Sequence, residues 1–248
     1  METAGLGEGP YAPKPSITNI IHLLDEGFLP GYYAKLVAEH AVQNLDTIKA
    51  NVTKFGPDLA IGALKAVPAQ PHPNGPIGDE VHDAIDAMIH GRPATPLTTV
   101  TARNMFAQFQ HFMAVEKPEV IQTEFTVWSY KYGYAGTGDL LWVYQGALWI
   151  VDTKTGQRIW PKVAMQDGAL ANADVILDAD GNEHPMPKAT RFGCLHIRPR
   201  SAKLFELDHV DEAFKAFLGL KAAFDWGRFY KAGTIPAEPL ARTEYKAA

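Results

Sequence analysis

The stretch GDLLWVYQGALWIVDTK, residues 138–154, decides the fold of this chain, because two alternating apolar runs flank the dipeptide Gln145-Gly146. A two-residue turn at that dipeptide would join the runs as antiparallel strands. Counting outward from the turn places Asp139 directly opposite Asp152, with Cβ atoms about 5 Å apart. The sequence therefore predicts a β-hairpin that carries two carboxylates on one face.

Both faces of this predicted hairpin are apolar. The face with the acids carries Leu141, Val143, Leu148 and Ile150, and the other face carries Leu140, Trp142, Trp149 and Val151. Such strands belong inside a sheet that is covered on both sides. Lys154 lies two residues beyond Asp152 and projects to the same side, roughly 7 Å further along the strand. Like charges placed opposite each other are destabilising unless they are offset, and a divalent metal would offset them.

The composition describes an ordinary globular protein of 248 residues with a net charge of -5. No apolar run reaches membrane-spanning length, and the start of the chain lacks the pattern of a signal peptide, so we expect a cytoplasmic protein without a membrane partner. Cys194 is the only cysteine. The chain can therefore form no internal disulfide and cannot supply the four thiolates of an iron–sulfur cluster.

The charge is unevenly distributed along the sequence. A basic track begins at the acidic hairpin and consists of Lys154, Arg158, Lys162, Lys188, Arg191, Arg198, Arg200 and Lys203. Basic side chains beside a carboxylate site suit a substrate with a phosphate backbone. A solvated surface of mixed charge is the alternative interpretation, and the sequence leaves both open.

The remaining pattern indicates an α/β protein. Helical periodicity predicts helices over about 32–50, 57–66, 78–90, 97–115, 161–173 and 210–230, and period-two alternation predicts strands near 120–130, 134–144, 147–154, 175–177, 192–198 and 203–208. We expect a flexible start over 1–15, one domain over 16–231 and a loose tail over 232–248. Within the domain, a helical layer over 16–117 precedes an α/β core over 118–231.

Four short motifs occur in a fixed order along this core. They are Gly78-x-x-x-His82 in a helix, Gly136-Thr-Gly-Asp139 on a strand, Asp152-Thr-Lys154-Thr-Gly156 on the next strand, and Gln166 in the following helix. In this order the motifs resemble the PD-(D/E)XK nuclease superfamily, specifically its RecB-like branch with CRISPR-associated and bacteriophage exonucleases. Residues 16–42 also look like the leading helices of phage members. The resemblance implies a restriction-endonuclease-like core with a central mixed sheet flanked by helices.

The resemblance also implies roles for individual residues. Asp139, Asp152 and the carbonyl of Thr153 would hold Mg²⁺ or Mn²⁺, His82 would add a metal contact, and Lys154 would position or activate the attacking water. Arg158, Lys162 and Gln166 would contact the substrate backbone, and Glu124 is a candidate additional acid from the preceding strand. Oxygen-ligated cations suit phosphodiester hydrolysis, because they stabilise phosphoryl charge and generate hydroxide near neutral pH.

The sequence departs from this family pattern at two points. The branch often places a tyrosine four residues after its helix glutamine, and here that position is Leu170. The cysteines of the iron–sulfur members are also absent, so the resemblance implies a member without a cluster.

Each candidate also has a purely structural interpretation. The two acids with Lys154 could form an internal ion-pair network, although buried charges are seldom kept for stability alone. His82 could be a packed, hydrogen-bonded residue, and Glu124 a surface carboxylate. Gln166 and Lys162 could belong to a solvated helix face.

We therefore expect a metal-dependent deoxyribonuclease that acts on DNA ends in recombination, repair or phage DNA metabolism, with a recombination protein as a candidate partner. A catalytically inactive nuclease fold that binds DNA or assembles with other proteins is the first alternative. A structure-specific endonuclease is the second. Polarity, strand preference, DNA versus RNA and oligomeric state stay open.

Overall fold

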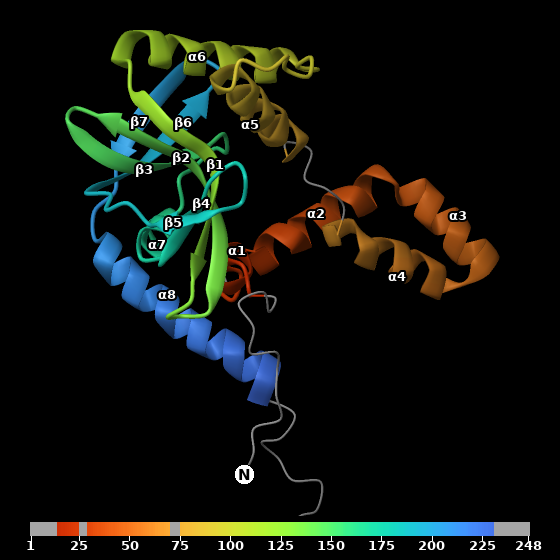
Figure 1. Ribbon diagram of the computed structural model, residues 1–248. Helices are drawn as coiled ribbons and strands as arrows, with labels where there is room; N and C mark the ends of the chain where they lie inside the picture. Colours follow the sequence, from red (N-terminus) through yellow and green to blue (C-terminus); the bar gives the residue numbers. More distant parts are fainter. Residues whose placement is uncertain (1–13, 25–28, 70–74, 231–248) are drawn as a thin grey trace, which may run out of the picture.

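A computed structural model describes residues 14–24, 29–69 and 75–230, and within them one seven-stranded mixed sheet forms the centre of the molecule (Figure 1). The strand order is β5-β4-β1-β2-β3-β6-β7, and every neighbouring pair is antiparallel except β3 and β6. The strands are β1 (Glu119–Ser129), β2 (Tyr134–Tyr144), β3 (Ala147–Lys154), β4 (Val175–Leu177), β5 (Glu183–Pro185), β6 (Arg191–Arg198) and β7 (Ser201–Glu206). The mixed α/β class predicted from the sequence is confirmed.

The predicted hairpin is the β2–β3 pair, and its register is confirmed. Tyr144 pairs with Ala147 across the two-residue turn. Gln145 and Gly146 both have positive φ, 50° and 75°, which is the backbone of a type I′ turn whose twist matches that of the flanking strands. A glycine at the second position adopts this conformation without steric cost.

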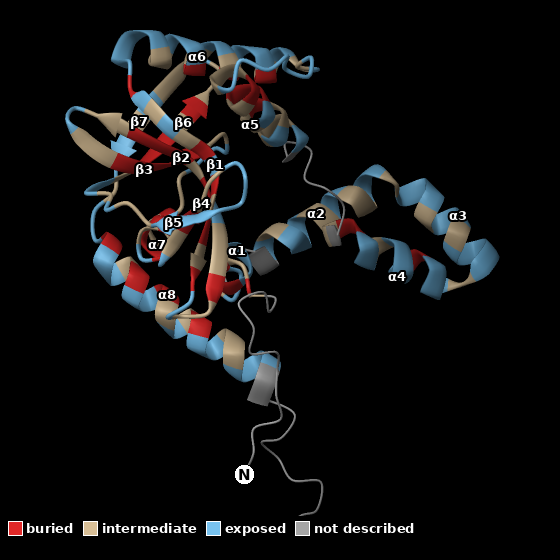
Figure 2. Cartoon of the chain, in the orientation of Figure 1, coloured by how far each residue is buried: buried red, intermediate tan, exposed pale blue. Residues whose placement is uncertain are grey.

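Helices cover both faces of the sheet. They are α1 (Ile17–Ile21), α2 (Leu29–Gln43), α3 (Leu45–Phe55), α4 (Pro57–Ala66), α5 (Gly75–Ile89), α6 (Val100–Glu116), α7 (Lys162–Ala171) and α8 (Val210–Asp225), with short helical turns at Val67–Ala69 and Trp226–Tyr230. Helices α1, α7 and α8 cover one face, and α5 and α6 cover the other (Figures 1 and 2). The helices before residue 117 therefore do not form the single layer that we expected from the sequence.

The two apolar faces of the hairpin belong to two separate core clusters. Leu141 and Ile150 pack with residues of α1, α7 and α8, whereas Leu140, Trp142 and Val151 pack with α5 and α6. This is the division of faces that the period-two pattern predicts. Burial on both sides explains why neither face of these strands is polar.

Helices α2, α3 and α4 pack against one another outside these two layers (Figure 1). The sequence predicted one helix over 32–50, but the chain divides at Asn44 into α2 and α3. Asn44 has φ -115° and ψ 23°, outside helical geometry, and its amide donates to the carbonyl of His40. Apolar periodicity continues across such a break, so it could not reveal the division.

Other differences are small. Strand β5 lies between the strands predicted near 175–177 and 192–198, where we predicted no strand, and it adds a short edge to β4. Helix α7 ends at Ala171, and the helix predicted over 210–230 changes to a π-helical turn at Trp226. The start and tail expected over 1–15 and 232–248 lie almost wholly outside the described residues. Among the described residues, no helix combines the length and apolarity needed to cross a bilayer.

Gly138, in the motif before Asp139, is required by close packing. A Cβ at this position would lie 2.3 Å from Phe125 Cζ and 2.9 Å from Leu170 Cδ1. We expect Gly138→Ala to lower the free energy of unfolding by about 1–3 kcal/mol, as overpacked core positions do. Urea unfolding of the two proteins measures this difference. Gly62→Ala is the control, since Gly62 lies in α4 with open space around its Cα, and an equal loss in both variants would contradict the packing argument.

Candidate functional site

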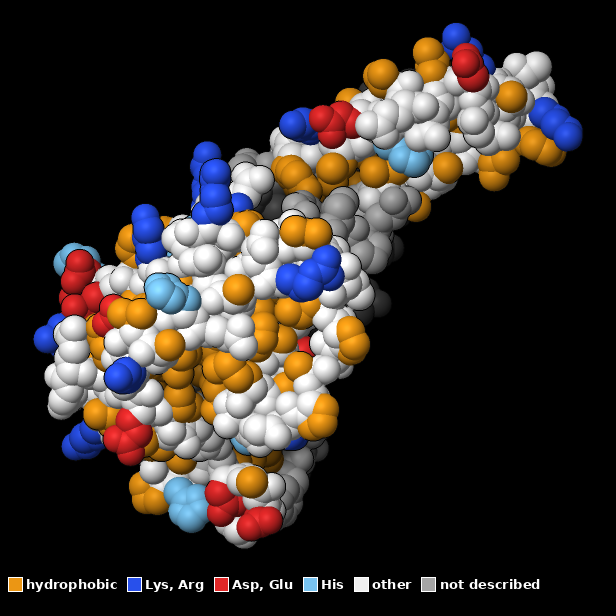
Figure 3. All heavy atoms as spheres, turned by 90° about the horizontal axis from the view of Figure 1, so that it is seen from above, with side chains coloured by type: hydrophobic (Ala, Val, Ile, Leu, Met, Phe, Trp, Pro, Cys, Tyr) orange, Lys and Arg blue, Asp and Glu red, His pale blue; other side chains and the backbone are white. Residues whose placement is uncertain are grey.

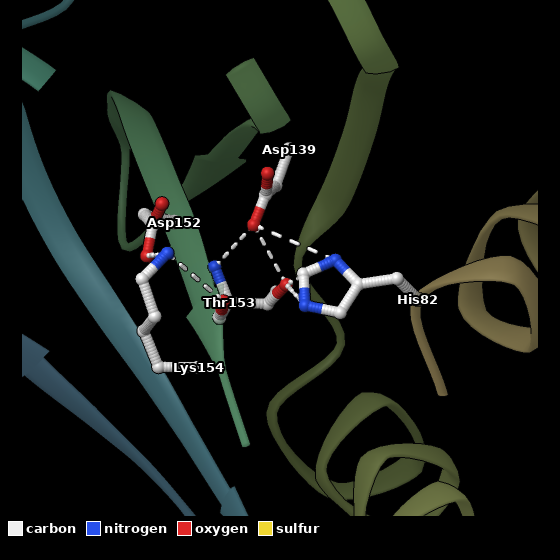
Figure 4. Close-up of polar contacts among 5 residues, drawn as sticks. All are labelled: His82, Asp139, Asp152, Thr153 and Lys154. Carbon is white, nitrogen blue, oxygen red and sulfur yellow. Dashed lines mark hydrogen bonds and ion pairs between the residues drawn. The ribbon is translucent and has the colours of Figure 1, made fainter. Parts of the chain in front are cut away.

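The predicted acids lie where the β2–β3 pairing ends. The last pair of the ladder is Leu140 with Val151, and the next residues outward on each strand are Asp139 and Asp152. Beyond this point the two carboxylates make different contacts (Figure 4). The structure divides the charged residues into two groups.

The first group consists of His82 from α5, Glu124 from β1 and Asp139 from β2, and we call it the α5-side group. Each residue offers one ligand atom, and these three atoms lie within 4.8 Å of one another. Histidine nitrogen and two carboxylate oxygens form a donor set that Mn²⁺ and Mg²⁺ can use. The sequence predicted all three residues as metal ligands or additional acids, and the fold brings them together.

Glu124 joins this group through an unusual backbone conformation. Its φ of 46° is left-handed, a region that non-glycine residues seldom occupy. The residue before it, Thr123, donates a hydrogen bond to Asp86 of α5. The residue after it, Phe125, packs on the opposite face of the sheet, in the core with α7. Residues two apart on a regular strand share a face, so the left-handed residue reverses the alternation of β1 at this point. Such local strain is often found at functional sites.

Thr153 holds Asp139 in place. Its backbone N–H and its hydroxyl donate to Asp139 Oδ2 at 2.6 Å and 2.7 Å (Figure 4). Both ring nitrogens of His82 lie 3.2 Å from Thr153 Oγ1, and His82 Nδ1 lies 3.8 Å from Asp139 Oδ2. Because the hydroxyl proton goes to Asp139, Thr153 Oγ1 accepts from the imidazole. The Thr153 side chain thus connects the acid with the histidine.

The second group consists of Asp152 and Lys154 from β3 and Asp167 from α7, and we call it the α7-side group. Asp152 is 1% exposed and forms an ion pair with Lys154. Lys154 Nζ also donates to the Thr153 carbonyl at 3.4 Å, the carbonyl that we expected to bind metal. The expectation that Asp139 and Asp152 hold one common ion stays a prediction.

Burial and neighbouring charge determine the protonation of the α7-side group. Burial raises the pKa of Asp152, Asp139 raises it further, and Lys154 opposes both. Burial by itself would lower the pKa of Lys154, but the carboxylates of Asp152 and Asp139 outweigh it and raise the pKa overall. Lys154 is therefore an ammonium that stabilises negative charge, rather than a base that removes a proton.

Asp167 was missed by sequence reasoning. It is fully buried on the inner face of α7, between Val163 and Leu170 at helical spacing. The sequence held one indication of it: Asp167 is an acid at a position of the apolar helical stripe, and it directly follows Gln166 of the family motif.

The predicted substrate contacts lie at the start of α7 and in the loop before it. Gln166 and Lys162 are half-buried and Arg158 is exposed, and none of them belongs to either charged group. At least one arginine of the basic track forms hydrogen bonds within the protein. Arg198 donates to the carbonyls of Thr155 and Gly156 at 2.6 Å and 2.8 Å, and it thereby holds the loop that follows Lys154.

No protein-family model matches the chain, and no curated protein sequence matches it. The residues themselves fit Mg²⁺ or Mn²⁺, because the α5-side group supplies clustered oxygen and nitrogen donors. In the α7-side group, Asp152 Oδ1 and both oxygens of Asp167 are buried without a hydrogen-bond partner among the described residues. Cys194 is buried and unpaired beside this group.

The pKa of Glu124 gives a pH prediction. Burial of its carboxyl and the charges of Asp139, Asp86 and Asp83 raise this pKa from the ordinary 4.5 to about 7. The folded protein thus binds a proton more tightly than the unfolded chain does, so stability falls as the pH rises from about 4.5 to about 7. We expect metal-free Glu124→Gln to lose less stability than wild type between pH 5 and pH 8 in urea unfolding. Glu119→Gln, at an exposed position on the same strand, should follow wild type, and identical pH dependence in all three proteins would contradict the shift.

The Thr153 side chain gives a second prediction. Thr153→Val keeps the shape of the residue but removes one hydrogen bond to Asp139 and the contact with His82. We expect the affinity for Mn²⁺ at the α5-side group to fall about tenfold, the effect typical of losing a supporting hydrogen bond. Isothermal titration calorimetry measures the affinity, and Thr153→Ser should retain it. Equal affinities for the valine variant and wild type would show that the hydroxyl does not support the site.

Proposed function

We propose that this protein is a metal-dependent deoxyribonuclease that hydrolyses phosphodiester bonds at DNA ends. The observation that carries the proposal is the convergence of His82, Glu124 and Asp139 within 4.8 Å, next to the Asp152–Lys154 pair. Three carboxylates, an imidazole and an ammonium at one strand end form an uncommon grouping, and perturbed acids of this kind mark functional sites. The PD-(D/E)XK resemblance of the same residues supports phosphoryl chemistry over other metal-assisted reactions.

A bound Mg²⁺ or Mn²⁺ would polarise the scissile phosphate and lower the pKa of a coordinated water. The α5-side group would hold the ion, with Thr153 orienting Asp139. Lys154 keeps its proton and would stabilise the negative charge that develops on the phosphoryl oxygens. Arg158, which is exposed in the loop before α7, can meet the DNA backbone.

The proposal is tested by cleavage of end-labelled linear duplex and single-stranded DNA with Mn²⁺. We expect Asp139→Asn and Lys154→Ala to lower the rate at least about a hundredfold, because each removes a charge that acts on the reacting phosphate. Lys215→Ala, which removes an exposed lysine of α8 outside the basic track, should leave the rate unchanged. Wild-type rates in the first two variants would refute the assignment.

The form of the DNA separates an exonuclease from an endonuclease. Closed circular duplex has no ends, so an enzyme specific for ends should leave it intact while it degrades the linear form. Equal cleavage of both forms would favour the endonuclease alternative.

One observation favours a second candidate, a nuclease fold used for binding or assembly. Asp152 is almost fully buried and already paired with Lys154, as expected for a structural ion pair. In addition, helices α2–α4 carry the exposed apolar side chains Val42, Leu45, Val52, Phe55, Leu59 and Ile61. Figure 3 shows hydrophobic side chains on the projecting part of the molecule. Such surfaces often contact other proteins. DNA binding without cleavage at any Mg²⁺ or Mn²⁺ concentration would support this second candidate.

A further inference from the structure

Asp167 is a buried acid that the fold leaves without a hydrogen-bond partner. It is 0% exposed, and neither of its carboxylate oxygens has a hydrogen-bond partner among the described residues. A buried carboxylate of this kind is costly unless it is paired or coordinates a metal. Helix α7 packs on the sheet at β2, β3 and β6 and also against α1 and α8, and the carboxylate of Asp167 lies in this interior.

The carboxyl of Asp167 lies in the field of the other charged residues of the site. Burial raises the pKa of Asp167, the carboxylates of Asp152 and Asp139 raise it further, and the ammonium of Lys154 opposes them. Asp152 Oδ1 is also buried without a hydrogen-bond partner, because the ion pair with Lys154 uses Oδ2. Asp152 and Asp167 together present three buried oxygens without a hydrogen-bond partner among the described residues, and a divalent cation would bind such oxygens in place of protons.

We propose that Asp167 and Asp152 hold a divalent cation, Mg²⁺ or Mn²⁺, between α7 and β3. This ion is distinct from one at the α5-side group, because Asp167 approaches the sheet from α7, whereas His82 approaches it from α5. Hard carboxylate oxygens with no competing hydrogen bonds are the ligands that these ions prefer. The binding itself rests on the buried carboxylate oxygens without a partner among the described residues, and only a role for this ion in hydrolysis rests on the proposed function.

Lys154 controls entry to this position. Its side chain is 35% exposed, whereas Asp152 is 1% exposed, so the lysine lies between the acid and solvent. Lys154 and the cation compete for Asp152. Binding of the ion therefore releases the ammonium from its ion pair and leaves it available for the phosphate.

The first test measures Mn²⁺ bound to the full chain by the electron paramagnetic resonance signal of the free ion. We expect wild type to bind two ions, and Asp167→Asn to lose one of them or to bind it about tenfold more weakly or worse. Lys154→Ala should bind the same ion more tightly than wild type, because the competing ammonium is gone. Asp225→Asn is the matched control. Oδ1 of Asp225, on α8, is also buried without a hydrogen-bond partner among the described residues, but Oδ2 forms an ion pair with Lys221, so this variant should bind both ions as wild type does.

Unchanged stoichiometry and affinity in Asp167→Asn would overturn the proposal. That result is expected if the two acids share a proton instead of an ion. A measurement on the unaltered protein avoids dependence on how the variants fold. Crystals soaked in Mn²⁺ should show an anomalous peak in contact with both Asp152 and Asp167, and a peak confined to His82, Glu124 and Asp139 would overturn the proposal.

These readouts separate the cation site from the nuclease activity. A protein that binds Mn²⁺ at Asp167 but cleaves no DNA refutes the proposed function and leaves the cation site in place. If the protein cleaves DNA but Asp167→Asn binds the same two ions with wild-type affinity, the proposed function stands and the proposed cation site is refuted.

Discussion

The register of the β2–β3 hairpin determines where Asp139, Asp152 and Lys154 lie in the site. The turn at Gln145 and Gly146 sets the pairing, and the pairing brings Asp139 and Asp152 to the end of the ladder together. A slip of one residue would exchange the two faces of a strand and move its acid to the opposite core cluster. Because both faces are buried and differently packed, such a slip is costly, and the hairpin is held in one register.

This arrangement places charge where the fold would otherwise gain from apolar packing. Asp152 and Asp167 are buried as deeply as the apolar residues around them, and the pKa of each is raised mainly by that burial. The two apolar clusters have to supply the stability that these acids remove. Gly138 shows how tightly this core is packed, since a Cβ at position 138 would clash with Phe125.

The sequence is most informative where a local pattern determines the structure. Alternation and a two-residue turn were sufficient to predict β2 and β3 to the residue. Motif order selected Asp139 and His82, and the fold brings them together with Glu124, which was a candidate from the preceding strand. Asp167 and the left-handed Glu124 could not be predicted in this way. Both depend on contacts distant in the chain, namely the packing of α7 on β3 and the placement of β1 between two helical layers. The division at Asn44 could not be predicted either. It is a local feature, but apolar spacing does not change at a single non-helical residue.

The two charged groups reach the sheet from opposite layers, and this geometry restricts how a phosphate can meet both of them. His82 comes from α5 and Asp167 from α7, while Asp139, in the middle of β2, and Asp152, near the end of β3, lie between them where the β2–β3 pairing ends. Each face of the sheet is closed by its own helices and apolar cluster. Under the proposed function, a phosphate that contacts both groups would therefore lie where the β2–β3 pairing ends. In that position the ammonium of Lys154, which is paired with Asp152 and partly exposed at the end of β3, would be close to the acids and within reach of solvent. If the proposed function and the proposed cation site both hold, the same side chain would cover the buried acids in the absence of substrate and would contact the phosphate once an ion had displaced it.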